Sequence, residues 1–98
     1  MSYYNVVGFS KAIRSLGTTA QTVTVALRAK GIKGIPNNPC ACPIARYLKT
    51  FGFSTVSVTG SYVSFYNDRE GTTIKLPKTL RDWVYDFDMN NYPEFVDR

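Results

Sequence analysis

The sequence contains no histidine, and no acidic residue occurs before position 68. Without histidine the chain cannot form a Ser-His-Asp triad, a histidine metal site or the usual proton shuttle near neutral pH. All seven Asp and Glu residues lie in residues 68–98 with five Lys and Arg residues, whereas seven Lys and Arg residues lie in residues 1–67. The two parts therefore carry −2 and +7, and this asymmetry favours a positively charged binding surface in the first part.

Long apolar segments and cysteine clusters are also absent. No run approaches the roughly 18 apolar residues that a transmembrane helix needs, and the N-terminus lacks the pattern of a signal peptide. A disulfide between Cys40 and Cys42 would close a very small loop, and the pair supplies only two of the four ligands of a structural zinc site. We therefore predict a cytoplasmic protein with reduced thiols, no cofactor, no metal and no membrane partner.

The remaining composition is that of an ordinary folded domain. The chain has 98 residues, of which 44% are hydrophobic and 19% are charged. A chain of this length has enough residues for one hydrophobic core and too few for two. We expect residues 1–98 to form a single compact domain.

Apolar residues recur at helical spacing in three segments before residue 53, and a glycine follows each segment. The first helix is expected to begin near Gly8 or Ser10. The second has a threonine available as N-cap, although residues 22–25 also fit a strand. The third has proline at a favourable first helical position, directly after Cys42. The segments are Phe9, Ile13 and Leu16 before Gly17; Ala20, Val23 and Leu27 between Thr18 or Thr19 and Gly31; and Ile44, Tyr47, Leu48 and Phe51 between Pro43 and Gly52.

From Phe53 onward the pattern changes to alternation, which is typical of strands with one buried face. Tight turns at residues 60–61 and 67–71 separate three such runs, so the sequence predicts an antiparallel meander. Thr, Ser and Tyr occupy the other face of these runs. The positions expected to face the core are Val56 and Val58, Val63 and Phe65, and Ile74 and Leu76.

A fourth helical stripe follows the meander. Thr79 and Asp82 have the spacing of a capping box at its start, residues 89–91 end it, and residues 92–96 are expected to dock as a tail. Three strands alone bury too little surface, so the helices must cover their apolar face. The predicted fold class is α+β, with three N-terminal helices packed on a three-stranded antiparallel meander and a C-terminal helix after it. The apolar stripe of that last helix is Leu80, Trp83, Val84 and Phe87.

Three short segments carry a resemblance to a known group of proteins. They read Gly-Ile-Lys-Gly at residues 31–34, Cys-Pro-x-Ala-x-Tyr-Leu at residues 42–48 and Phe-Asp-x-x-x-Tyr-Pro at residues 87–93. In this pattern the chain resembles small, functionally uncharacterised proteins of actinobacteria and their phages. The resemblance implies a shared fold and a phage or host setting, and it assigns no role to any residue.

Catalysis is disfavoured by the residues themselves. Cys42 is expected at a helix N-terminus, where a thiolate is favoured, with Arg46 one turn later. However, no histidine is present to accept its proton, so we favour a structural cap at Cys42 with Cys40 packed under the loop. Asp82 and Asp86 are neighbours on one helix surface, which is typical of a solvated acidic face. We predict no enzyme activity and no catalytic residue.

Binding is the favoured function, and two partner classes stay open. The first is nucleic acid, with the cations of residues 1–67 on its phosphates; the second is an acidic protein partner, such as a host protein modulated by a phage-encoded factor. Residues 31–34 resemble the loop of a KH domain, and three helices before a hairpin match a winged helix. The long connection before the third helix argues against both motifs. The candidate binding residues are Lys11, Arg14, Arg28, Lys30, Lys33, Arg46 and Lys49, with Tyr62 and Tyr66, joined by Phe53 or Tyr47, as an exposed stacking platform.

Overall fold

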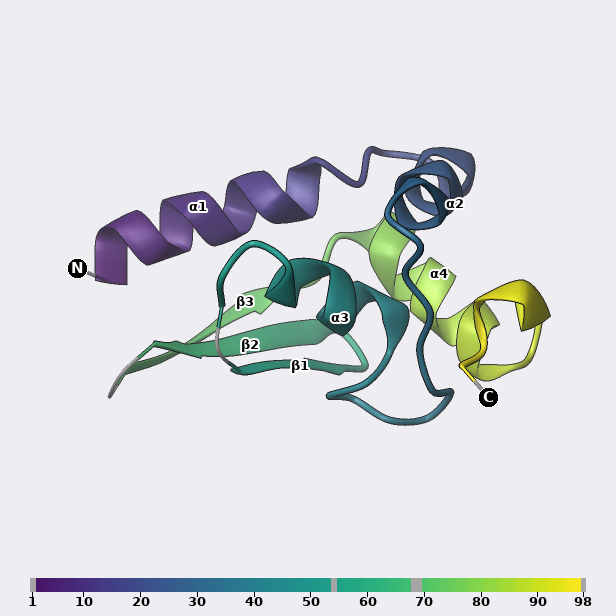
Figure 1. Cartoon of the computed structure of the whole chain (residues 1–98). Coiled ribbons are helices and arrows are strands. Elements are labelled where there is room, and N and C mark those ends of the chain that lie inside the picture. Colours follow the sequence, from purple (N-terminus) through teal and green to yellow (C-terminus); the bar gives the residue numbers. More distant parts are fainter. Residues whose placement is uncertain (1, 54, 68–69, 98) are drawn as a thin grey trace.

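The computed structural model describes residues 2–53, 55–67 and 70–97, and it confirms the predicted α+β fold (Figure 1). Helices precede an antiparallel sheet, and a last helix and a tail follow it. None of the described helices is long and apolar enough to cross a membrane. The elements are α1 (Ser2–Arg14), α2 (Ala20–Ala29), α3 (Pro43–Lys49), β1 (Thr55–Thr59), β2 (Tyr62–Asn67), β3 (Glu70–Lys75), α4 (Lys78–Asp88) and a 3-10 helix at Pro93–Phe95.

The sheet has the strand order β1-β2-β3, with β2 in the centre. Its apolar face is covered by α1 and α3, which lie on the same side of it in Figure 1. Phe9 of α1 stacks on Phe65 of β2 with 4.0 Å between the ring centroids, and both side chains are buried. The opposite face of the sheet carries no helix in Figure 1. One face of the meander therefore belongs to the core, and the other faces solvent.

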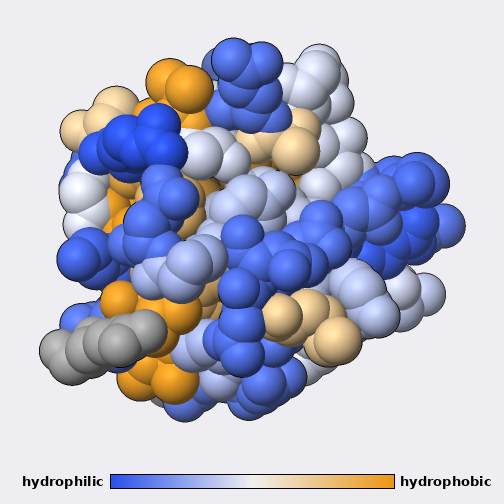
Figure 2. All heavy atoms as spheres, turned by 90° about the vertical axis from the view of Figure 1, so that its right-hand side faces the viewer, coloured by the Kyte–Doolittle hydropathy of each residue, from blue (hydrophilic) through white to orange (hydrophobic). Residues whose placement is uncertain are grey.

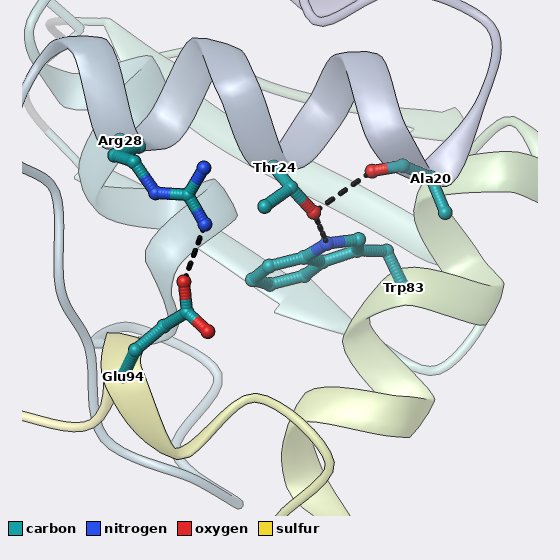
Figure 3. Close-up of polar contacts among 5 residues, drawn as sticks. All are labelled: Ala20, Thr24, Arg28, Trp83 and Glu94. Carbon is teal, nitrogen blue, oxygen red and sulfur yellow. Dashed lines mark hydrogen bonds and ion pairs between the residues drawn. The ribbon is translucent and has the colours of Figure 1, made fainter.

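A second part of the same core joins α2, α4 and the C-terminal tail. Trp83 of α4 is 1% exposed, and its ring stacks on Tyr92 at 4.6 Å and on Phe87 at 5.7 Å. Its indole N–H donates to the hydroxyl of Thr24 on α2 at 3.1 Å, as Figure 3 shows. Phe95 packs edge-on against the same indole ring, which confirms that the tail docks on the core.

Several predicted helix signals are confirmed. Thr19 caps α2 through its side chain, with Thr22 closing a reciprocal capping box. The Sγ atom of Cys42 accepts the N–H of Ala45 at the start of α3, and Pro43 occupies the first helical position. Gly31 and Gly52 follow the second and third helices with φ of 64° and 96°, conformations that glycine adopts without strain.

Three predicted boundaries are wrong. Helix α1 begins at Ser2 rather than near Gly8, because Gly8 keeps a helical backbone on an open side of the helix. The second turn is shorter than residues 67–71, since Asn67 pairs with Glu70; residues 68 and 69 lie outside the described residues. Helix α4 begins at Lys78 after Pro77 and has no side-chain cap.

The predicted capping box of α4 is replaced by other contacts. The Thr79 hydroxyl donates to the carbonyl of Thr18 at 2.9 Å, which ties α4 to the turn before α2. Asp82 accepts from the ammonium of Lys78 at 2.7 Å, and that contact lowers the pKa of the carboxyl group. Because both side chains have these partners, neither satisfies the first N–H groups of the helix.

Two apolar residues lie further out than predicted. Ala20 is exposed, because it is the first residue of α2 and precedes the buried positions Val23 and Leu27. Phe51 is 44% exposed, because α3 ends at Lys49 and the chain turns at Gly52 before the ring can join the helical stripe.

Candidate binding surfaces

Five of the seven predicted cations lie on the C-terminal part of α2, on residues 30–33 and on α3, which contact one another. We call this surface the basic end, and its members are Arg28, Lys30, Lys33, Arg46 and Lys49. The guanidinium of Arg46 donates to the carbonyl of Lys33 at 3.0 Å, and the ammonium of Lys30 lies 3.5 Å from the hydroxyl of Thr50. These contacts join the segment after α2 to α3 and the end of α2 to the residue after α3.

The C-terminal tail neutralises two of these five charges. Arg28 pairs with Glu94, as Figure 3 shows, and Arg46 pairs with Asp97 at 2.7 Å. The tail is held close by backbone contacts as well, since the Gly34 N–H donates to the Phe95 carbonyl at 2.8 Å. The face of the molecule that carries α2 and the tail is mainly hydrophilic, with small apolar groups between the polar side chains (Figure 2).

The three remaining lysines of the basic end keep an unbalanced charge. The ammonium of Lys30 lies 4.5 Å from the ring centroid of Phe51 and 5.2 Å from that of Tyr47. The ammonium of Lys49 donates to the carbonyl of Cys40 at 2.9 Å, and Lys33 forms no ion pair with any described residue. The basic end therefore has a surplus of three positive charges next to a half-exposed aromatic ring.

Lys11 and Arg14 are not part of the basic end. Both are exposed on α1, and among the described residues neither has an acidic partner. Arg14 instead lines two adjoining cavities between α1 and the end of β3, where Lys75 is also present. Lys75 lies outside the acid-free part of the sequence, so counting charges up to residue 67 missed it. The structure thus divides the predicted cationic surface into two.

Tyr62 and Tyr66 occupy the outer face of the sheet, as predicted from their alternation. They are 51% and 53% exposed, and in register Tyr62 lies between Thr59 and Lys75. The suggested additions to this platform are wrong. Phe53 packs edge-on against Phe9 on the inner side of the sheet. Tyr47 is 3% exposed and shares a hydrogen bond with Ser15 under α1.

The two cysteines behave differently from one another. Cys42 is buried, and desolvation raises the pKa of its thiol to about 11, so almost no thiolate is present at neutral pH. It borders a cavity of about 280 Å³ in which one carboxylate lies among the described lining residues, that of Asp88, which accepts the backbone N–H of Asn37. Cys40 is exposed rather than packed under the loop, because its N–H bonds the side chain of Asn38 within the turn.

The described residues contain no cluster of three or more ligands that could hold a metal ion. Gly34 is buried and pairs with Val96 as an isolated parallel bridge. A Cβ atom at Gly34 would lie 2.5 Å from the backbone nitrogen of Pro43, so only glycine allows the segment after α2 to approach the start of α3 this closely.

Comparisons of the chain with protein-family models, curated proteins and solved structures find no match. The resemblance of residues 31–34, 42–48 and 87–93 to small proteins of actinobacteria and their phages therefore stays a prediction.

Proposed function

We propose that this protein is a non-enzymatic, cytoplasmic nucleic-acid-binding protein that contacts phosphates through the basic end. The observation that carries the proposal is the surplus of Lys30, Lys33 and Lys49 at one surface, beside the half-exposed ring of Phe51. Lysine ammonium groups bind phosphates as point charges, and an exposed aromatic ring beside them offers a stacking surface for an unpaired base.

The helix at this surface cannot read a sequence. Pro43, Ile44, Ala45, Tyr47 and Leu48 of α3 are all buried, which leaves only Arg46 and Lys49 directed outward. Both of these side chains are already engaged with the chain's own carbonyls. We therefore expect binding with little sequence preference, dominated by phosphate contacts and steeply weakened by salt.

The test is fluorescence anisotropy with a labelled single-stranded 20-mer, titrated at several salt concentrations. The triple variant K30Q/K33Q/K49Q should bind more weakly and lower the slope of log K against log salt by about 2, because each phosphate contact contributes about 0.7 on single strands. The matched control K11Q/R14Q/K75Q removes the same charge elsewhere and should bind nearly as well as the parent. If the unmodified protein does not bind the oligonucleotide at 50 mM salt, the proposal is wrong.

The outer face of the sheet favours a second candidate function, docking of a protein partner. Tyr62 and Tyr66 are half-exposed on the outer face of the sheet, which also carries Thr, Ser and Lys75, and tyrosine is frequent at protein interfaces. The double variant Y62S/Y66S separates the two uses. A tenfold loss of oligonucleotide affinity would assign the rings to base stacking, whereas an unchanged affinity favours a protein partner for this face.

A further inference from the structure

The two edge strands of the sheet differ in whether their outward backbone groups are hydrogen-bonded. On the β1 edge, the N–H of Val58 donates to the carbonyl of Pro39 at 2.9 Å, so the loop before α3 covers this strand. The other edge is formed by β3. At the end of this strand the N–H of Leu76 donates to the carbonyl of Ser61, so it points toward β2. Because ladder bonds alternate in an antiparallel pair, the N–H and C=O groups of residues 71, 73 and 75 then point away from β2. No described residue pairs with them.

A groove runs beside this open edge, under α1. Ser10, Ile13 and Arg14 of α1 face Ile74, Lys75 and Pro77 across a cavity of about 180 Å³. Beyond Arg14 and Pro77, a second cavity of about 390 Å³ continues to Leu80 at the start of α4. The floor of the groove is apolar, since Ile13 and Leu80 are buried there and Ile74 is only partly covered.

The charged side chains at the groove are all positive among the described residues. Arg14 and Lys75 line it, Lys11 lies one helical turn from Arg14, and none of the described residues that line it is acidic. None of these three cations forms an ion pair with a described residue. An open strand edge, an apolar floor and cationic walls together define what fits: an extended backbone with alternating apolar and acidic side chains.

We propose that an extended acidic segment of a partner protein adds to β3 as a fourth strand and inserts its apolar side chains under α1. Its backbone would pair with residues 71, 73 and 75, and its apolar side chains would lie beside Ile74 under α1. Its carboxylates would point to the opposite face, where Lys75 lies in register with Tyr62, while Lys11 and Arg14 on α1 add to the positive charge that attracts them. This is a site distinct from the basic end. A nucleic-acid strand offers no regular donors and acceptors for the ladder, and a second copy of this chain would bring another Arg14 and Lys75 to the same edge.

The probe is an N-acetylated, fluorescein-labelled octapeptide that alternates glutamate and valine. It should bind the protein with measurable anisotropy and shift the NMR amide signals of Gly71, Thr73 and Lys75. Two controls separate backbone pairing from charge alone. The same peptide N-methylated at alternate residues cannot pair with the edge and should bind at least tenfold more weakly, and an alternating lysine and valine peptide should not bind.

Two variants test the site on the protein. T73P removes one outward N–H without breaking a bond of the ladder, since proline is tolerated at such edge positions, and should weaken peptide binding at least tenfold. If T73P fails to fold by circular dichroism, K11Q/R14Q/K75Q is the second variant, and we expect it to lose about tenfold through charge. K30Q/K33Q/K49Q should leave peptide affinity unchanged, so a failure of peptide binding can be distinguished from a failure of nucleic-acid binding.

Three results would overturn the proposal. The N-methylated peptide could bind as tightly as its parent, which would show attraction by charge without strand addition. The shifted amide signals could belong to the basic end or to the outer sheet face. Sedimentation equilibrium could show that the chain self-associates through β3 and that the peptide does not compete, which would make a second copy the occupant.

Discussion

The basic end and the groove beside β3 carry the same surplus of three positive charges in different surroundings. At the basic end, the tail supplies Glu94 and Asp97, and most of the lysines contact the chain's own carbonyls, hydroxyls or rings. In the groove, the described lining residues include no acid, the floor is apolar, and no described residue pairs with the outward groups of β3. Charge alone therefore says little about the partner, and the neighbouring groups decide whether a surface fits phosphates or a peptide.

The largest expected effect comes from the residue that anchors the tail to the core. Phe95 is 3% exposed and packs on Trp83 and Tyr92. Phe95→Ala should lower the free energy of unfolding by about 4 kcal/mol, the usual cost of deleting a buried aromatic ring. Urea unfolding followed by Trp83 fluorescence measures it. A loss below about 1 kcal/mol would mean that the tail contributes little to the core.

Gly34→Ala tests the close contact between the segment after α2 and the start of α3. The added Cβ would meet the backbone nitrogen of Pro43 and, at 2.6 Å, the carbonyl oxygen of Ala41, and neither can move without shifting α3. We expect a loss of about 3 kcal/mol by urea unfolding. The matched control Gly8→Ala meets nothing within 4 Å inside α1 and should gain about 0.5–1 kcal/mol. Equal effects at both glycines would contradict the packing described here.

The cap of α3, beneath the basic end, should make stability depend on pH. Burial raises the pKa of the Cys42 thiol to about 11 from an ordinary value of 9.0. The unfolded chain then loses this proton first, so stability is full below pH 9 and falls as the pH rises towards 11, by about 2 kcal/mol. Cys42→Ser keeps a capping side chain that does not titrate. The difference between the two pH profiles isolates the thiol, and parallel profiles would contradict its burial.

The smallest expected effects come from the ion pairs that distinguish the basic end. Arg28–Glu94 is more than half exposed on both sides, so Arg28→Gln should cost no more than about 0.5 kcal/mol. Arg46 is less exposed and also bonds Lys33, so Arg46→Gln should cost about 1 kcal/mol. Both losses should shrink in 1 M salt. The double variant E94Q/D97N should raise oligonucleotide affinity severalfold and leave peptide affinity unchanged.

The local part of this fold was predictable from the sequence. Glycines after the second and third helices, Thr19 as a cap and the alternation of Val56, Val58, Val63 and Phe65 act within a few residues, so their patterns predict helices and strands directly. The start of α4 was not predictable in the same way, because the Thr79 hydroxyl finds its partner in Thr18, 61 residues away.

The candidate surfaces were only partly predictable for the same reason. The positive charge of residues 1–67 is plain in the sequence, but Arg28 and Arg46 are neutralised by acids 66 and 51 residues further along. The role of Gly34 depends on contacts with Pro43 and Phe95, which only the tertiary fold brings together. Long-range pairing of this kind leaves no periodic signal in one sequence.

One crossed experiment tests the division into two surfaces most directly. The variants K30Q/K33Q/K49Q and K11Q/R14Q/K75Q each lose three positive charges, and each is titrated with the single-stranded 20-mer and with the acidic octapeptide. We predict a crossed result, in which the first variant loses the oligonucleotide but keeps the peptide and the second does the reverse. Equal weakening of both ligands by both variants would contradict this account, because it would show that net charge, and not the surroundings of each surface, determines binding.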